Sequence, residues 1–160
     1  MTGVRRRVAP VREEVPMSSI TLAIDVKAPP TRVFEILSTT QGQQSFWTSD
    51  CDVAPDHARF GFAEAPVDLV VSVHREPDSL VRMTVLSGFP FWEGSTWEWE
   101  LSPHDDENCT TVVFRHYGFA DGYSDSNLGG TAQTWAMILH HLSTFVESGL
   151  ANPYFGSTPR

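Results

Sequence analysis

A long amphipathic helix near the end of the chain constrains the fold more than any other feature. Six segments patterned like strands lead up to residues 131–147, where apolar side chains recur at helical spacing. The apolar stripe consists of Trp135, Ile138, Leu139, Leu142, Phe145 and Val146. A meander of strands closed by one long helix predicts a curved antiparallel sheet wrapped around that helix. Such folds commonly hold a pocket between sheet and helix.

Length and composition indicate one domain. The chain has 160 residues, of which 41% are hydrophobic, enough for a single core. The formal net charge of −9 argues against nucleic-acid and anionic-membrane partners, because both need a basic surface. No apolar run is long enough to span a membrane. We therefore expect neither a nucleic-acid nor a membrane partner, and the sequence does not specify an oligomeric state.

The two ends of the chain differ from its centre. Residues 1–17 are rich in proline and charge and predict a disordered tail before a domain over 18–150. Met17 stands directly before the first strand and is a candidate for the native start. Residues 151–160 predict a loose C-terminal tail. Because no apolar secretory signal is present, we expect a cytoplasmic protein in which Cys51 and Cys109 are free thiols.

The coarse order of elements follows from periodicity. Alternation predicts a strand over 19–26, and the prolines after it favour a helix over 30–37. The side chains expected to face inward from this helix are Val33, Phe34 and Leu37. Thr40 is expected to cap a second short helix that ends near Trp47. Alternation then predicts six further strands over 51–54, 58–63, 67–75, 80–86, 96–101 and 110–117.

The connections and the last helix complete this outline. Short turn-forming clusters between the strands favour antiparallel hairpins. Gly149 is expected to cap the long helix at its C-terminal end. The fold class is therefore α+β, with a curved antiparallel sheet of about six to seven strands around the long helix.

This order of elements resembles the START-like superfamily, also described as SRPBCC, helix-grip or Bet v 1-like proteins. Residues 28–37 (APPTRVFEIL) resemble the family's AP-x-x-V-W-x-x-L entry, and residues 76–81 resemble its P-x-x-L-V hairpin. Trp47 closes the second helix, and residues 130–142 resemble the family's final helix. The resemblance covers 18–149 and is nearest to bacterial domains related to Hsp90-ATPase-activator homologues and polyketide cyclases.

The sequence departs from the family pattern at three places. Phe34 stands where the family often has tryptophan, and residues 59–62 (RFGF) replace a usual double-glycine strand start. Gly129 and Gly130 lie several residues before Trp135 instead of next to it. These departures leave the fold prediction intact and leave the subfamily open.

The resemblance implies an internal cavity for an apolar or amphipathic ligand, without a cofactor. The apolar face of the strands and the helix stripe supply its candidate lining, although each of these residues also serves as core. The candidate ligand-binding residues are Trp47, Leu69, Val71, Met83, Val85, Trp97, Trp99, Phe114, His116, Trp135, Leu139 and Leu142.

His116 is the polar residue of most interest. It shares a strand face with Val112 and Phe114 and should point inward. It has two interpretations, a buried hydrogen-bonded histidine or a ligand-orienting donor or general base. His74 and Arg82 fall on the outer face of the predicted sheet.

Other polar motifs support no catalytic or metal site. Glu98 and Glu100 alternate with tryptophans and should face solvent. His140 and His141 diverge by about 100° on a helix, so they cannot ligate one metal ion together. The chain has no HExxH, GxSxG, P-loop or dinucleotide-binding motif, so we expect no metal.

Two connections are candidates for function. Residues 88–94 (GFPFWEG) place three aromatic side chains in a turn, which either fold back on the core or form a lid or apolar contact patch. Residues 118–130 are rich in Gly, Asp and Ser, and are expected to form a mobile loop that gates the pocket.

Three functions fit these patterns. The leading hypothesis is binding of a hydrophobic or aromatic small molecule in the cavity between sheet and helix. The alternatives are a cofactor-independent cyclase or aromatase, with His116 as acid or base, and a co-chaperone-like interaction module. An apolar cavity would favour binding, two or more inward ionisable groups would favour catalysis, and a solid core with an exposed apolar patch would favour interaction.

Overall fold

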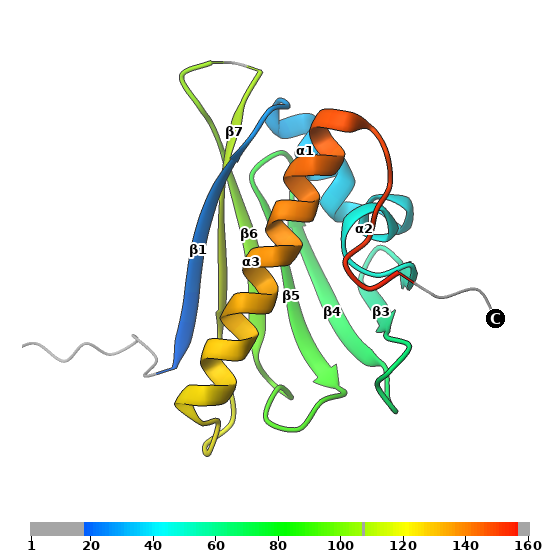
Figure 1. The fold of residues 1–160 in the computed structure, drawn as a ribbon, viewed down its shortest axis with the longest axis vertical. Coiled ribbons are helices and arrows are strands. Elements are labelled where there is room, and N and C mark those ends of the chain that lie inside the picture. The colour runs from blue at the N-terminus through cyan, green and yellow to red at the C-terminus, as the bar shows by residue number, and fades with distance from the viewer. Residues whose placement is uncertain (1–17, 107, 157–160) are drawn as a thin grey trace, which may run out of the picture.

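The computed structural model describes residues 18–106 and 108–156. The predicted N-terminal tail, 1–17, lies outside these residues. Seven strands and three helices follow one another in the predicted order, and no strand end differs from its prediction by more than two residues (Figure 1). The elements are β1 (Ser19–Val26), α1 (Pro30–Ser38), α2 (Thr40–Phe46), β2 (Asp50–Val53), β3 (His57–Gly61), β4 (Leu69–Glu76), β5 (Leu80–Ser87), β6 (Thr96–Pro103), β7 (Thr110–Tyr117) and α3 (Asp125–Ser148).

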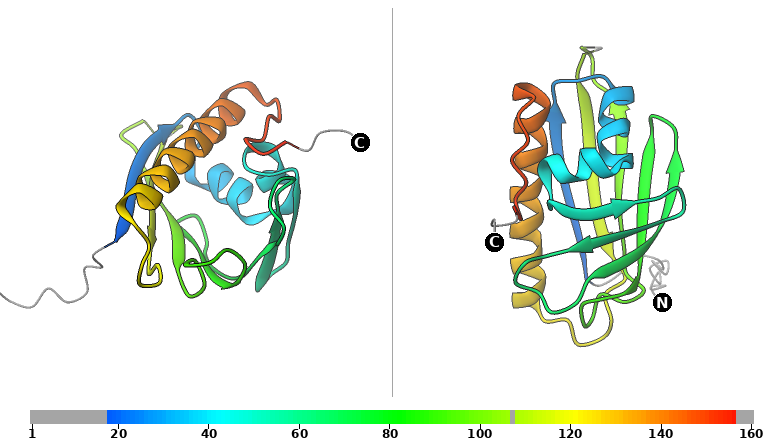
Figure 2. Two further views of the ribbon diagram at one scale, coloured as in Figure 1. Left: turned by 60° about the horizontal axis from the view of Figure 1, so that its bottom comes forward. Right: turned by 90° about the vertical axis from the view of Figure 1, so that its right-hand side faces the viewer.

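The seven strands form one antiparallel sheet in the order β1-β7-β6-β5-β4-β3-β2. Seen from its end, the sheet curves around α3, while α1 and α2 lie on the same concave side (Figure 2). The long helix packs against β1 and against α2, and α1 packs on β5 and β6. The predicted α+β helix-grip architecture is confirmed.

The strand register explains which side chains reach the concave side. Ile20 pairs with His116, His116 with Trp97, and Trp97 with Met83, so these four side chains form one row across four strands. Residues directly opposite each other in adjacent strands point to the same face. All four are buried, and the most exposed of them, Ile20, is 3% exposed. The inward direction predicted for His116 is therefore confirmed.

The two short helices differ from their predictions in detail. Val33, Ile36 and Leu37 are the buried side chains of α1, whereas Phe34, predicted to face inward, is only half-buried at the margin of the core. The cap of α2 is Thr39, whose hydroxyl accepts a hydrogen bond from the Gly42 amide, and not Thr40. The Thr40 hydroxyl instead bonds to the backbone of β2, so a tertiary contact decided which threonine caps the helix.

The long helix begins six residues earlier than predicted. Ser124 caps it through a hydrogen bond from the Asn127 amide to its hydroxyl, and Gly149 caps its C-terminal end as predicted. Gly129 and Gly130 lie inside α3, so the expected loop over 118–130 is wrong for its second half. A glycine in a helix interior destabilises the helix by about 1 kcal/mol relative to alanine, and for this reason the sequence predicted a loop at this pair.

The predicted loose C-terminal tail is wrong for residues 152–155. The amides of Asn152, Tyr154 and Phe155 donate hydrogen bonds to the carbonyls of Ser45, Phe46 and Trp47, at 3.0, 3.0 and 2.7 Å. Phe155 also forms an isolated parallel bridge with Thr48. The backbone of this segment is therefore satisfied by α2 and the turn after it.

The outer face of the sheet carries the charged residues. His74, Arg82 and Glu100 lie there, as predicted. Glu98 also lies there, but only 8% of it is exposed, because Arg82, Arg115 and the Tyr117 hydroxyl bond to its carboxylate. The expectation of a solvated Glu98 is therefore wrong, since paired neighbours cover it.

Candidate ligand cavity

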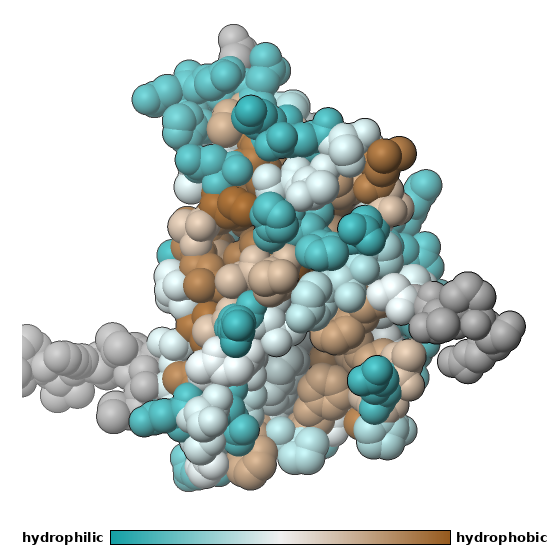
Figure 3. All heavy atoms as spheres, in the orientation of Figure 1, coloured by the Kyte–Doolittle hydropathy of each residue, from teal (hydrophilic) through white to brown (hydrophobic). Residues whose placement is uncertain are grey.

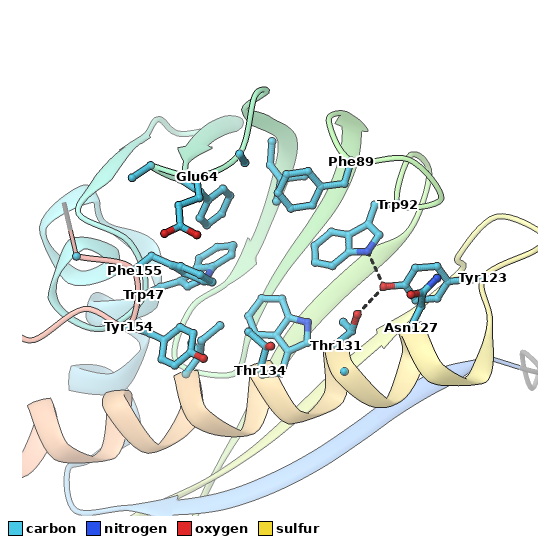
Figure 4. Close-up of a pocket in the computed structure, with 18 of the residues that line it drawn as sticks. Trp47, Glu64, Phe89, Trp92, Tyr123, Asn127, Thr131, Thr134, Tyr154 and Phe155 are labelled. Atoms are coloured by element: carbon cyan, nitrogen blue, oxygen red, sulfur yellow. Dashed lines mark hydrogen bonds between the residues drawn. The ribbon is translucent and has the colours of Figure 1, made fainter. Parts of the chain in front are cut away.

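A cavity of about 850 Å³ lies between the first half of α3 and the curved end of the sheet. Its walls come from the β3–β4 loop, the β5–β6 loop, the first turns of α3 and the C-terminal segment (Figure 4). In the space-filling view, a hollow with apolar surface opens beside α3 (Figure 3). A volume of this size lies within the range of about 300–1,000 Å³ that small-molecule sites occupy.

Trp47, Leu69 and Trp135 form the floor of the cavity and are almost fully buried. The rings of Trp47 and Trp135 lie 5.2 Å apart between centroids. Both rings also contact Trp97 in the core beneath, at 5.5 Å each. The floor is therefore a rigid layer of packed rings, which resists collapse of the cavity.

The walls are also aromatic. Phe62 contacts Phe89 at 5.6 Å and Phe155 at 5.0 Å, and Phe89 contacts Trp92 at 5.2 Å. These rings come from two loops and from the C-terminal segment, so segments far apart in sequence close one wall. The sequence left two alternatives for residues 88–94, folding back on the core or forming a lid or apolar contact patch. In the structure Phe89 and Trp92 line the cavity, while Phe91 is 41% exposed.

A polar group of residues lies at the end of the cavity near the start of α3. The Trp92 indole N–H donates to the Tyr123 hydroxyl at 3.1 Å, and this hydroxyl hydrogen-bonds to that of Thr131 (Figure 4). The side chain of Asn127 also faces the cavity, and among the described residues it has no hydrogen-bond partner. This end of the cavity can therefore bind a hydroxyl or carbonyl group of a ligand.

Gly130 lines the cavity one turn further along α3, and a Cβ added there would meet nothing within 4 Å. The glycine that interrupted the helical pattern thus lies where a side chain would project into the cavity. Thr134 follows on the same wall, and in the described part of the chain its hydroxyl bonds to no other side chain.

His116 lies beneath the cavity and is fully buried. Its Nδ1 accepts a hydrogen bond from the Trp135 indole at 3.1 Å, so the neutral ring carries its proton on Nε2 and donates to the Ser95 hydroxyl at 3.0 Å. Burial lowers the pKa of His116 to about 3. Both nitrogens are occupied and the ring is neutral at physiological pH, which fits the structural interpretation and not a general base.

The candidate lining predicted from the sequence separates into two groups. Trp47, Leu69 and Trp135 line the cavity. The structure places the other nine in the packed layer below it, namely Val71, Met83, Val85, Trp97, Trp99, Phe114, His116, Leu139 and Leu142.

Much of the lining was missed because it belongs to connections and to the C-terminal segment, and part of it because the first turns of α3 were predicted as loop. Phe62 and Glu64 follow the end of β3, Phe89 and Trp92 follow β5, and Tyr123 precedes α3. Two signals in the sequence pointed to the lining. They were the aromatic side chains of residues 88–94 and the prediction that residues 118–130 lie at the pocket, a range that contains Tyr123, Asn127 and Gly130.

The described residues contain no group of three or more His, Cys, Asp or Glu side chains that could hold a metal ion. His141 hydrogen-bonds to the carbonyl of Asn152, and His140 is exposed on α3. Cys51 and Cys109 are free thiols, as predicted. No helix within 18–106 and 108–156 has the length and apolar character needed to cross a membrane.

No family model matches this sequence, and no curated protein matches it significantly. Solved structures do match. The Aha1 dimer from Colwellia psychrerythraea is 25% identical, with a TM-score of 0.71 over 83% of this chain and 98% of that chain. DynU16, from the dynemicin biosynthetic locus, is 18% identical, with a TM-score of 0.70 over 89% of this chain and 52% of that one. CalU16 from Micromonospora echinospora is 18% identical, with a TM-score of 0.62 over 86% and 78%.

These neighbours share the curved sheet and the long C-terminal helix of the present chain. The fold is therefore that of the START-like, helix-grip superfamily, as the sequence resemblance predicted. At these identities the likeness defines the architecture, and the cavity itself has to supply the argument for function.

Proposed function

We propose that this protein binds an aromatic, amphipathic small molecule in the cavity beside α3. The observation that carries the proposal is the lining, in which packed aromatic rings surround a few polar side chains without partners in the described structure, Asn127 and Thr134 among them. Ligand sites typically combine such an apolar wall with a few polar groups that orient the ligand. The names of the structural neighbours are compatible with this proposal but do not specify a ligand.

The two alternative functions have weaker support. The cyclase hypothesis named His116 as its acid or base. His116 is not part of the cavity lining, both of its ring nitrogens are hydrogen-bonded and burial lowers its pKa to about 3, so it gives this alternative little support. An interaction module needs a contiguous apolar patch. The exposed large apolar side chains come from different elements, namely Val67, Leu86, Phe91, Met137 and Leu150.

Binding can be tested by filling the cavity from α3. Gly130→Trp places an indole in the cavity, whereas Gly129→Trp adds the same group to a neighbouring helical position that does not line it. Both added side chains start in open space, so both variants should fold. Naphthylethanol, a neutral aromatic alcohol, serves as the probe in isothermal titration calorimetry.

We expect Gly130→Trp to weaken naphthylethanol binding by about tenfold or more, and Gly129→Trp to leave it unchanged. Native mass spectrometry of protein purified from its own host should show a small-molecule adduct that Gly130→Trp removes. Absence of binding to the unmodified chain, or equal binding by both variants, would contradict the proposal.

A further inference from the structure

Glu64 is the one acidic side chain in the cavity lining, and no Lys, Arg or His joins it there among the described residues. It lies in the β3–β4 loop, two residues after Phe62. Figure 4 shows its carboxylate at the edge of the cavity, above Phe155, where the residue is exposed. This end of the cavity lies opposite the polar group at Tyr123.

The backbone of the loop accounts for this position. The Ala65 amide donates a hydrogen bond of 3.0 Å to the Phe62 carbonyl, which closes a turn around residues 63 and 64. Phe62 is held by aromatic contacts with Trp47 at 5.8 Å and with Phe155 at 5.0 Å. The position of the Glu64 carboxylate is therefore set by a turn whose first residue, Phe62, packs in the cavity wall.

No cation of the described chain neutralises Glu64. The basic residue of the preceding strand, Arg59, already bonds to Asp50 at 2.8 Å, Asp52 at 3.0 Å and Asp68 at 3.3 Å. These three acidic neighbours raise the pKa of Arg59 further above its ordinary value. Among the described residues Glu64 itself has neither an ion pair nor a hydrogen bond, so its charge is available to a ligand.

A carboxylate beside aromatic faces is a favourable environment for an organic cation. The electron-rich face of an indole or phenyl ring attracts an ammonium group within about 6 Å, and the carboxylate adds a direct charge interaction. The same site disfavours a ligand carboxylate, because like charges repel at short range. The net charge of −9 reinforces this preference across the whole surface.

We infer that the ligand carries a protonated amine, which lies against Glu64 and the rings of Phe62, Trp47 and Phe155. Its aromatic body fills the cavity, and a hydroxyl or carbonyl group at its other end reaches Tyr123 and Asn127. This inference rests on the proposed function, since it specifies the charge of the molecule that the cavity binds. It excludes fatty acids and other anionic amphiphiles as preferred ligands.

Three probes of one size and different charge test the inference. Naphthylethylammonium, naphthylethanol and naphthylacetate share the aromatic body and differ in the terminal group. Isothermal titration calorimetry at neutral pH should show naphthylethylammonium binding about tenfold more tightly than naphthylethanol, and naphthylacetate binding most weakly. Added salt should weaken the binding of naphthylethylammonium and leave the binding of naphthylethanol unchanged.

Variants separate a local charge effect from a general one. Glu64→Gln should bring the affinity for naphthylethylammonium down to that for naphthylethanol, whose affinity stays unchanged. Glu93→Gln removes the same charge from an exposed loop position outside the lining and should leave the preference for the cation intact. Glu64→Lys should reverse the order and favour naphthylacetate.

The outcomes distinguish this inference from the proposed function. If naphthylethanol binds and the ammonium probe binds no better, the cavity proposal stands and the charge preference is wrong. If Glu93→Gln removes the preference as fully as Glu64→Gln, net charge and not Glu64 is responsible, which also overturns the inference. If none of the three probes binds, the proposed function is contradicted, and the inference that rests on it is contradicted with it.

Discussion

The indole N–H of Trp135 donates a hydrogen bond of 3.1 Å to Nδ1 of His116, joining the long helix to the centre of the sheet. Both residues are almost fully buried, and the Trp135 ring also lies 4.4 Å from that of Phe114. This polar contact joins the sheet to a helix whose other contacts are mostly apolar. It also orients the Trp135 ring, which forms part of the cavity floor. The stability of the fold and the shape of the cavity are therefore linked at this pair.

The first prediction concerns pH. The pKa of a free histidine is about 6.5, whereas burial lowers the pKa of His116 to about 3. Between these values the unfolded chain binds a proton that the folded chain does not, so this residue makes stability fall as the pH is lowered. The slope is up to about 1.4 kcal/mol per pH unit. Above about pH 6.5 the effect vanishes, because both states are neutral at this position.

His116→Gln removes this titration. Urea unfolding at about pH 7 and about pH 5 should show that the variant loses about 2 kcal/mol less than the unmodified chain on acidification. The matched control is His140→Gln, which removes an exposed histidine of α3 and should keep the original slope. An unchanged slope in His116→Gln would show that the histidine is charged in the folded state.

The second prediction separates the two contributions of Trp135. Trp135→Ala should destabilise the fold by about 3–5 kcal/mol, as expected for a large buried aromatic residue. Trp135→Phe retains most of the packing but leaves Nδ1 of His116 without its donor, at a cost of about 1–3 kcal/mol. Chemical denaturation measures both values. Equal stability of Trp135→Phe and the unmodified chain would mean that the hydrogen bond contributes nothing.

The third prediction concerns the close approach of the two short helices. A Cβ at Gly42 would lie 1.9 Å from the carbonyl oxygen of Ile36, which is backbone and cannot move aside alone. Gly42→Ala should therefore cost about 3 kcal/mol. Gly129→Ala, where the added carbon meets nothing within 4 Å, should instead stabilise the protein by about 0.5–1 kcal/mol. Thermal unfolding of both variants checks the opposite signs.

The fourth prediction tests whether the C-terminal segment is part of the domain. The Phe155 ring contacts Phe62 at 5.0 Å and Tyr154 at 4.8 Å. Phe155→Ala should lower the free energy of unfolding by about 1–2 kcal/mol and weaken naphthylethanol binding, because it opens one wall. Leu150→Ala, which removes a 72% exposed side chain, should change stability by less than about 0.5 kcal/mol. Equal effects of the two substitutions would mean that Phe155 is not docked in solution.

The fifth prediction concerns thiol reactivity. Only 3% of Cys51 is exposed, and burial, with Asp52 nearby, raises the pKa of its thiol to about 12. Cys109 is half-buried in the β6–β7 loop. A thiol reagent at about pH 8 should therefore label one cysteine quickly in the folded protein and the second only after unfolding. The fast reaction should persist in Cys51→Ser and disappear in Cys109→Ser.

The elements that the sequence predicted correctly are those whose pattern is local. Alternation in β7 placed Val112, Phe114 and His116 on one face, and the structure buries all three. The stripe on α3 likewise identified Trp135 and Leu142 as buried. A period of two or of 3.6 residues follows from backbone geometry alone, so it can be read without knowledge of the neighbouring segments.

The errors fall where a second segment decides the outcome. Thr39 rather than Thr40 caps α2 because β2 binds the Thr40 hydroxyl. Glu98 is buried because Arg82 and Arg115, from the two adjacent strands, cover it. Neither result follows from the residue's own neighbours in sequence.

The order of strands and helices, and the side chains that face the core, could be predicted from the amino-acid sequence, because periodicity and turn chemistry are properties of the local chain. The lining of the cavity depends on packing between distant segments. Glu64, Trp92, Tyr123 and Phe155 come from connections and from the C-terminal segment, whose conformations depend on contacts with distant parts of the chain. The position of such residues is therefore set by packing, and packing also places one free carboxylate among the rings.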